Sequence, residues 1–250
     1  MKRFNRFELK YAVTATQAEA VRCDLAHHMV VDDNSTDDGC YDIASLYYDT
    51  PDLAFMRAKR EGIKFRRKVR IRRYGKADAL ADDNQPVYVE IKQRINRTTQ
   101  KRRLTLPLAA AYALCAGHLE GAIEDATDSE AADEVLFLVR SLDLQPTCLV
   151  GYRREAFVGS RYEPGLRVTF DNSLWAAQAD GGLAQSNARH AIVPPQTYLM
   201  EVKANNAVPV WLASMLARHR CTLTRYSKYC AAVACLDKLD LLVLAPVASQ

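Results

Sequence analysis

The sequence predicts an α+β protein: an eight-stranded antiparallel β-barrel that forms a tunnel, with helices packed around the outside. Three observations lead to this fold class. Eight segments alternate apolar and polar residues with the two-residue period of a β-strand. The polar positions of most of these segments carry Lys or Arg. Helical patterns lie between and after the strands, where they can cover the apolar faces while the charged faces line a wet lumen.

The strand pattern is clearest in residues 64–73. The even positions are all cations, whereas Phe65, Val69 and Ile71 stand at odd positions. A row of like charges on one face would repel itself in a flat, solvated strand. This face is therefore expected to meet an anion. The other expected strands are residues 6–11, 43–49, 87–94, 101–106, 148–158, 166–171 and 198–203.

Five helices are expected, at residues 16–29, 108–118, 130–142, 208–219 and 227–242. Thr14 or Thr16 is suited to cap the first of them, because a hydroxyl accepts from the free N–H groups of a helix start. Two polar stretches, residues 75–85 and 172–195, read as loops. Short connections between successive strands favour antiparallel pairing.

Composition indicates one large domain over residues 1–250, since 49% of the residues are hydrophobic. The net charge is only +4, which does not by itself point to a polyanionic partner. The distribution is more informative. Residues 57–73 hold ten Lys or Arg and one Glu, whereas residues 32–42 are acidic. Such segregation indicates a local electrostatic field rather than a generally basic surface.

The seven cysteines are scattered, and no two form a CxxC pair. The chain opens without a secretory signal, so reduced thiols and a cytoplasmic location are expected. The apolar stretch at residues 230–247 is interrupted by Asp237, Lys238 and Asp240, which makes it too polar to span a bilayer. The chain is thus expected to have no membrane segment of its own. A membrane-protein partner is conceivable but unsupported by the residues.

The polar faces of the eight strands combine many cations with a few carboxylates. The cations are Lys10, Lys64, Arg66, Lys68, Arg70, Arg72, Lys92, Arg94, Lys101, Arg103, Arg154, Arg167 and Lys203; the carboxylates are Glu8, Asp49, Glu90, Asp171 and Glu201. Lys and Arg neutralise phosphate oxygens, and Arg can do so in a bidentate way. Carboxylates supply the hard oxygen ligands that Mg²⁺ or Mn²⁺ prefers. This mixture favours a lumen that binds a polyanion together with a divalent metal.

Two other interpretations of the cation faces stay open. Each strand taken alone is also compatible with a half-buried sheet whose charged face is solvated. A basic surface for nucleic acid is less favoured, because base stacking needs aromatic residues among the cations, and residues 64–73 contain only Phe65. No nucleic-acid partner is therefore expected. The sequence has no P-loop, GxGxxG or GxSxG motif that would indicate a different chemistry.

Several runs, in order along nearly the whole chain, resemble the VTC domain. The runs are residues 6–11 (RFELKY), 45–50 (SLYYDT), 68–75 (KVRIRRYG), 89–92 (VEIK), 152–157 (YRREAF), 167–171 (RVTFD), 200–203 (MEVK) and 225–229 (RYSKY). The VTC domain is the polyphosphate-polymerase domain of the vacuolar transporter chaperone complex and its bacterial relatives. It belongs to the triphosphate tunnel metalloenzymes, alongside the CYTH phosphatases. The resemblance implies an antiparallel tunnel and a metal-dependent reaction on a triphosphate.

The resemblance and the charged faces together give a set of expected site residues. The catalytic cations are Arg70, Arg72, Lys92, Arg154, Arg167 and Lys228. The remaining substrate-binding residues are Lys10, Lys68, Lys101, Arg103, Tyr152, Lys203, Arg225 and Ser227. Glu201 is the first expected metal ligand, with Glu8 or Glu90 assisting. Arg225 replaces a lysine expected at that position of the motif, which keeps the charge but changes its geometry.

One departure from the wider superfamily bears on the reaction. CYTH members open with Glu-x-Glu-x-Lys, whereas this chain has Arg6, Glu8 and Lys10 at those positions. The substitution resembles the VTC branch more than a simple triphosphatase, and it leaves fewer metal ligands. The expected function is phosphoryl transfer from a nucleoside triphosphate, chiefly ATP, onto polyphosphate, with Mn²⁺ or Mg²⁺ and no protein nucleophile. Alternatives are a triphosphate hydrolase, a non-catalytic module that binds polyphosphate or inositol polyphosphates, and processing of RNA 5′-triphosphates.

Overall fold

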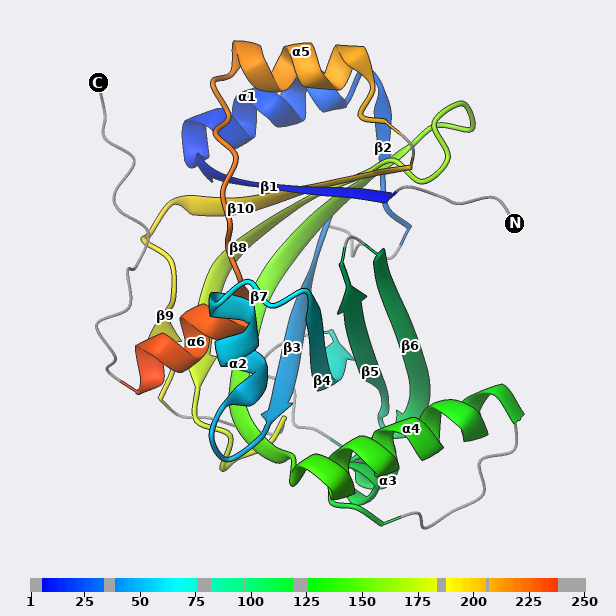
Figure 1. Cartoon of the computed structure of the whole chain (residues 1–250). Helices are drawn as coiled ribbons and strands as arrows, with labels where there is room; N and C mark the ends of the chain where they lie inside the picture. The colour runs from blue at the N-terminus through cyan, green and yellow to red at the C-terminus, as the bar shows by residue number, and fades with distance from the viewer. Residues whose placement is uncertain are drawn as a thin grey trace. The chain divides into compact units, whose positions relative to one another are not determined.

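A computed structural model of the chain describes residues 6–33, 39–75, 82–96, 98–118, 126–183, 188–205 and 207–237 (Figure 1). Within these residues it contains one antiparallel sheet and six helices. The strands are β1 (Arg6–Thr14), β2 (Met29–Val31), β3 (Cys40–Asp49), β4 (Phe65–Tyr74), β5 (Pro86–Ile95), β6 (Thr98–Pro107), β7 (Gln145–Gly159), β8 (Arg167–Ala177), β9 (His190–Ala191) and β10 (Thr197–Asn205). The helices are α1 (Ala15–Leu25), α2 (Ala54–Arg60), α3 (Leu108–Cys115), α4 (Ala126–Leu142), α5 (Val210–Arg218) and α6 (Lys228–Leu236).

The eight predicted strands are confirmed as the main path of the sheet, whose order is β1-β10-β8-β7-β3-β4-β5-β6. The sheet has ten strands in all, because β2 pairs with β7 and β9 pairs with β8 off this path. These two strands have only three and two residues, too few to show an alternation. The path of paired strands begins at β1 and ends at β6, so closure into a barrel stays a prediction.

The predicted helices are all present, with shifted ends. The first stops at Leu25 because residues 26–28 form a turn before β2. Residues 238–242 of the last predicted helix lie outside the described residues. The helix α2 was missed, since its N-cap residue, Leu53, makes no capping hydrogen bond with its side chain. The predicted loop at residues 172–195 was wrong at its start, because β8 continues to Ala177 and buries Leu174 and Ala176.

Two compact units divide the chain by its internal contacts. Unit 1 comprises Met1–Asp42, Tyr152–Leu174 and Val193–Ser227. Unit 2 comprises Ile43–Gly151, Trp175–Ile192 and Lys228–Gln250. Strands β3, β7 and β8 contribute residues to both. A single domain over residues 1–250 stays a prediction.

In unit 1, helices α1 and α5 lie side by side over the apolar faces of β1 and β10 (Figure 1). Thr14 caps α1: its hydroxyl accepts from the Gln17 backbone N–H, and the Gln17 side chain accepts from the Thr14 N–H, which is a capping box. Val21 of α1 and Leu212 of α5 are fully buried against Val202 of β10. The helices thus cover the apolar face and leave the charged face of these strands on the other side.

Unit 2 repeats this arrangement with α3 and α4 over β5 and β6. Val69 and Ile71 of β4 are 0% exposed and join Ala111 of α3 and Leu138 of α4 in one apolar cluster. Burying such a side chain contributes about 1.5–3 kcal/mol. The alternation predicted for residues 64–73 is therefore confirmed, and the cations at even positions lie on the face away from α3 and α4. Within the described residues, no helix is both long and apolar enough to cross a membrane.

Asp49 organises the part of unit 2 where α2 begins. Its carboxylate is 0% exposed and accepts from the backbone N–H groups of Thr50 and Phe55 at 2.8 Å and of Met56 at 2.9 Å. It also accepts from the Tyr229 hydroxyl of α6 at 2.5 Å. A side chain five residues before the first residue of α2 therefore accepts from the N–H groups that Leu53 does not cap, and it also binds Tyr229 of α6.

Replacing Asp49 by alanine is expected to destabilise the protein by about 3–4 kcal/mol, because it leaves several buried donors without an acceptor. Urea unfolding followed by circular dichroism measures this. Asp52→Ala is the matched control, since the Asp52 side chain is 60% exposed in its ion pair with Arg57; there a change below about 0.5 kcal/mol is expected. Equal effects of the two variants would contradict the assigned role of Asp49.

Candidate phosphate-binding and metal-binding site

The register of unit 2 places the predicted cations in rows across three neighbouring strands. One row is Tyr47, Arg70, Glu90 and Arg103, from β3, β4, β5 and β6. The next consists of Lys68, Lys92 and Lys101, which we call the lysine row. On the other side, Arg72 stands between Ser45 and Tyr88. Because side chains in one row point to the same face, the sequence has gathered six predicted site cations around one carboxylate.

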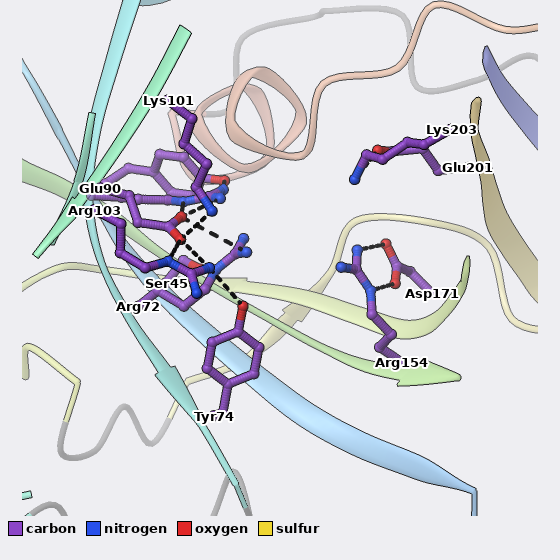
Figure 2. A network of polar contacts seen from close by, with 12 residues as sticks. Ser45, Arg72, Tyr74, Glu90, Lys101, Arg103, Arg154, Asp171, Glu201 and Lys203 are labelled. Atoms are coloured by element: carbon purple, nitrogen blue, oxygen red, sulfur yellow. Dashed lines mark hydrogen bonds and ion pairs between the residues drawn. The ribbon is translucent and has the colours of Figure 1, made fainter. Parts of the chain in front are cut away.

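Several cations of this face contact the carboxylate of Glu90 (Figure 2). Its Oε2 accepts from Arg70 Nε at 2.8 Å and Nη2 at 2.6 Å. Its Oε1 accepts from Arg103 Nε at 2.8 Å and lies 2.6 Å from Lys101 Nζ. Arg72 Nη1 lies 3.9 Å from Oε2. We call Glu90 with Arg70, Arg72, Lys101 and Arg103 the Glu90 cluster.

The charges of the Glu90 cluster change the acidity of its members. Burial acts to raise the pKa of Glu90, but the charges of Arg70 and Arg72 and the contact with Lys101 outweigh it and hold that pKa well below its usual value. Burial lowers the pKa of Lys101, and the contact with Glu90 opposes that effect. Six site cations lie on this face, which we call the cation face: Lys68, Arg70, Arg72, Lys92, Lys101 and Arg103. The single carboxylate of Glu90 neutralises only part of their charge. The face therefore has the charge to bind a phosphate chain.

Hydroxyl groups on β3 and β4 accept hydrogen bonds from three of the arginines. Arg70 Nη1 donates to the Tyr47 hydroxyl at 2.9 Å, Arg72 Nε donates to Ser45 Oγ at 3.2 Å, and Arg103 Nη2 donates to the Tyr74 hydroxyl at 3.3 Å. Sequence reasoning missed these partners, although Ser45 and Tyr47 stand on the predicted polar face of their strand.

Tyr47 is buried, and its ring stacks on Tyr229 with 5.0 Å between the centroids. Burial acts to raise the pKa of its phenol, but the nearby charges of Arg70, Lys68 and Arg72 outweigh burial and lower the pKa to about 8. The pKa of the buried Tyr47 phenol is therefore a measure of the positive electrostatic potential at the cation face.

One of the twelve tyrosines is therefore expected to ionise near pH 8, about two units before an ordinary phenol. Because the folded pKa is depressed, the stabilisation appears as pH rises from about 8 to about 10, and it is lost as pH falls through the folded pKa. Ultraviolet titration of tyrosinate measures the early step, and Tyr47→Phe is expected to remove it. An unchanged titration curve in this variant would contradict the cationic field.

Unit 1 carries two of the three predicted metal ligands, Glu8 and Glu201, and further cations. Lys10 of β1 lies opposite Glu201 of β10, and Glu8 lies opposite Lys203. Lys10 Nζ is 3.5 Å from Glu8 Oε1 and 3.8 Å from Glu201 Oε2, while Lys203 Nζ is 2.7 Å from Glu201 Oε1. Two carboxylates thus gather around one ammonium group. Lys10 also donates to the Tyr226 carbonyl at 3.3 Å, which brings the segment with Arg225 and Ser227 to this strand.

The two predicted arginines of unit 1 are each bound to a carboxylate. Arg154 donates to Asp171 in a bidentate pair, with distances of 2.6 and 2.8 Å (Figure 2). Burial acts to lower the pKa of Arg154, but the charge of Asp171 raises it well above its usual value. Arg167 Nη2 contacts Asp32 at 2.5 Å and the Tyr41 hydroxyl at 3.0 Å.

Charge is therefore distributed differently within the two units. In unit 1 the four cations Lys10, Arg154, Arg167 and Lys203 are matched by Glu8, Asp32, Asp171 and Glu201. Sequence reasoning placed Asp171 on this face but missed the pairing of Asp32. Tyr152 lies beside Arg154, whose guanidinium carbon is 5.2 Å from the ring centroid. Ser227 ends unit 1, whereas Lys228 begins α6 in unit 2.

The donors around Lys10 fit a divalent metal that is held partly by its substrate. Glu8 and Glu201 offer hard carboxylate oxygens, as Mg²⁺ and Mn²⁺ require. No set of three or more His, Cys, Asp or Glu gathers within the described part of the chain. Phosphate oxygens and water would therefore complete the coordination, as is usual for Mg²⁺ at phosphate sites. Glu90 differs from this pair in the number of cations around it, because Arg70, Lys101 and Arg103 contact its two oxygens and Arg72 lies 3.9 Å from Oε2.

Two solved structures are similar to this chain at low sequence identity. HpAC1 from Hippeastrum, a candidate adenylyl cyclase described as having a dominant triphosphatase activity, has a TM-score of 0.50 and 12% identity, covering 98% of each chain. A candidate adenylate cyclase from Bacillus halodurans has a TM-score of 0.49 and 12% identity, covering 89% of this chain and 95% of its own. No curated protein sequence matches the chain.

The family assignment comes from a direct match of the sequence. The VTC domain model matches residues 5–237, which include all eight strands of the main path and every predicted site residue. The chain belongs to the VTC domain family.

Proposed function

We propose that this protein synthesises polyphosphate by transferring phosphoryl groups from ATP, with Mn²⁺ or Mg²⁺ as cofactor. The observation that carries the proposal is the charge of the β4–β5–β6 face, where six site cations surround a single carboxylate. Such a face favours a ligand with several closely spaced negative charges over one with a single charge. We further propose that the reaction takes place in the cytoplasm and that the whole of residues 1–250 forms the enzyme.

Phosphoryl transfer needs little covalent chemistry from a protein, so its residues act by positioning and charge stabilisation. A terminal oxygen of the phosphate acceptor attacks the γ-phosphorus of ATP, and the bond from that phosphorus to the β–γ bridging oxygen breaks, releasing ADP. Arg70 and Arg72 project from β4 to one face and donate to the oxygens that gain charge. The lysine row holds the neighbouring phosphoryl groups.

The residues of unit 1 have separate parts in this proposal. Glu201 and Glu8 would hold the metal, which would supply charge neutralisation for phosphate oxygens. Lys10 and Lys203 lie beside these carboxylates and bind phosphate oxygens there. Arg154 and Arg167 add guanidinium donors, and Tyr152, Arg225 and Ser227 bind further phosphate oxygens. Lys228, at the start of α6 in unit 2, adds another cation for phosphate.

Triphosphate hydrolysis is the second candidate, and the triphosphatase activity described for HpAC1 favours it. The same cations would hold the triphosphate, and water would replace the phosphate acceptor. The two reactions differ in their products, because transfer gives a chain and ADP whereas hydrolysis gives free phosphate.

The test is to incubate the purified protein with ATP and Mn²⁺, and separately with Mg²⁺, and to measure long-chain polyphosphate, ADP and free phosphate. Polymer formed together with ADP supports the proposal. Free phosphate without polymer would replace it by hydrolysis. Tight, salt-sensitive binding of polyphosphate without turnover with either metal would replace it by a non-catalytic binding module. A preference for RNA 5′-triphosphates over ATP would contradict the assigned substrate.

A further inference from the structure

Glu90 lies at the centre of the cation face and is almost completely enclosed. Its side chain is 1% exposed, on the middle strand of three. Arg70 reaches it from β4 on one side, and Arg103 and Lys101 reach it from β6 on the other. The carboxylate therefore joins the cations of three strands at one point.

The contacts of Glu90 are those of a fixed counter-ion. Arg70 uses two nitrogens on Oε2, at 2.8 and 2.6 Å, and Arg103 uses two on Oε1, at 2.8 and 2.6 Å. A guanidinium held by two contacts to one oxygen has a defined plane and direction. Arg70 donates to the Tyr47 hydroxyl through a third nitrogen, Nη1, and Arg103 donates to the Tyr74 hydroxyl through Nη2, which also contacts Glu90. Each arginine is thus oriented from two sides.

A metal at Glu90 would face strong opposition. It would have to displace Arg70, Arg103 or Lys101 from the carboxylate oxygens, and it would then lie beside four cations. Repulsion between like charges at such short range outweighs the gain from one carboxylate. Glu8 and Glu201 meet no comparable surplus of cations in unit 1.

We propose that Glu90 is a positioning residue, and not a metal ligand: it orients Arg70, Arg103 and Lys101 so that they match an extended phosphate chain. This inference rests on the proposed function for the identity of the ligand. Glu90 then serves to fix the directions of the neighbouring cations, and the metal is bound elsewhere. Without Glu90, the cations would repel one another and spread over many side-chain conformations.

Glu90→Gln separates positioning from simple charge attraction. It keeps the size of the side chain but removes the charge that holds the two guanidinium groups. The remaining face carries one more net positive charge, so a small anion such as sulfate should bind more tightly. Tripolyphosphate also gains attraction, but it loses the ordered donors that match its successive phosphoryl groups, and we expect this loss to outweigh the gain. We therefore expect the selectivity for tripolyphosphate over sulfate to fall by about ten-fold.

The binding experiment needs no turnover. Calorimetric titrations with tripolyphosphate and with sulfate are made in EDTA, so that no metal contributes. Glu134→Gln is the matched control, because Glu134 pairs with Arg102, which precedes Arg103 on β6 and points to the opposite face. The control should keep the wild-type selectivity. Unchanged selectivity in Glu90→Gln would overturn the proposal, whether or not the protein turns over ATP.

Turnover gives a second readout where the proposed function holds. Loss of orientation is expected to lower kcat by about 10²-fold, with the Mn²⁺ concentration for half-maximal activity unchanged. A rise of ten-fold or more in that concentration, with kcat restored at saturating Mn²⁺, would instead make Glu90 a metal ligand. If Glu90→Gln lowers kcat, the affinities for both anions and the melting temperature together, the role of Glu90 is merely structural. If the wild-type protein makes no polymer, the proposed function is rejected. The titrations with tripolyphosphate and sulfate still test the role of Glu90, because they do not depend on turnover.

Glu90→Asp covers the case in which the glutamine variant does not fold. Aspartate keeps the charge that balances the face but is one methylene shorter, so it can reach only one of the flanking strands. We expect it to keep the wild-type melting temperature and sulfate affinity and to bind tripolyphosphate about three-fold to ten-fold more weakly. Wild-type binding of both anions by this variant would overturn the proposal.

Discussion

Replacing Arg70 by alanine is expected to lower the turnover of ATP with Mn²⁺ by about 10²–10³-fold. Arg70 is the cation that contacts Glu90 through two nitrogens and Tyr47 through a third. Its side chain is only 18% exposed, so its charge is weakly screened by solvent. Steady-state measurement of ADP and polymer, with ATP and Mn²⁺ at saturation, gives kcat and KM separately.

Arg70→Lys adds information about geometry. Lysine keeps the charge but cannot make a planar, two-nitrogen contact, so we expect it to recover only part of the loss. Arg102→Ala is the control, because it removes a β6 arginine that pairs with Glu134 on the helix-covered face. Equal loss in the Arg70 and Arg102 variants would contradict the assignment of the reaction to the cation face.

Replacing Glu201 by glutamine is expected to lower metal-dependent turnover by about 10²-fold or more and to raise the Mn²⁺ requirement. Glutamine keeps a neutral oxygen but loses the charge that binds a hard cation. Activity measured across a series of Mn²⁺ concentrations gives both effects. Binding of tripolyphosphate in EDTA should not weaken, since the variant also frees Lys203 and Lys10 from a competing carboxylate.

Glu155→Gln is the matched control for Glu201. Both side chains are mostly buried, 18% and 12% exposed, and both are ion-paired within unit 1. Glu155, however, pairs with Arg22 of α1 on the helix-covered side. An unchanged Mn²⁺ requirement in Glu201→Gln would remove Glu201 from the metal site, and a changed one in Glu155→Gln would show that the effect is not specific.

Which side chains of a strand point to the core and which to the opposite face was predictable, because successive side chains alternate between the two faces. Once Val69 and Ile71 are assigned to the core, Arg70 and Arg72 must lie on the opposite face. The same reasoning placed Glu201 with Lys203 and Glu90 with Lys92. The eight strands of the main path follow from this pattern alone.

The partners of the site residues were not predictable, because they depend on register between strands distant in sequence. Nothing in the local sequence tells that Glu90 lies opposite both Arg70 and Arg103. The acidic stretch at residues 32–42 was read as a source of field, whereas Asp32 is in fact the ion-pair partner of Arg167.

Short elements were missed for a related reason. The helix α2 has seven residues, and its N-terminal N–H groups are satisfied by Asp49 from the preceding strand rather than by a residue of its own cap. A seven-residue helix is also too short to show a clear helical period. Sequence patterns therefore predict the long, regular strands better than the tertiary contacts that start a short helix.

The most direct test of the central claim is a crystal structure of the protein with tripolyphosphate and Mn²⁺, with the metal located by anomalous scattering. We expect phosphate oxygens within hydrogen-bonding distance of Arg70, Arg72 and Lys92, and Mn²⁺ bound by Glu201. Tripolyphosphate bound elsewhere, with Arg70 and Arg103 still contacting only Glu90 and their tyrosines, would contradict the account.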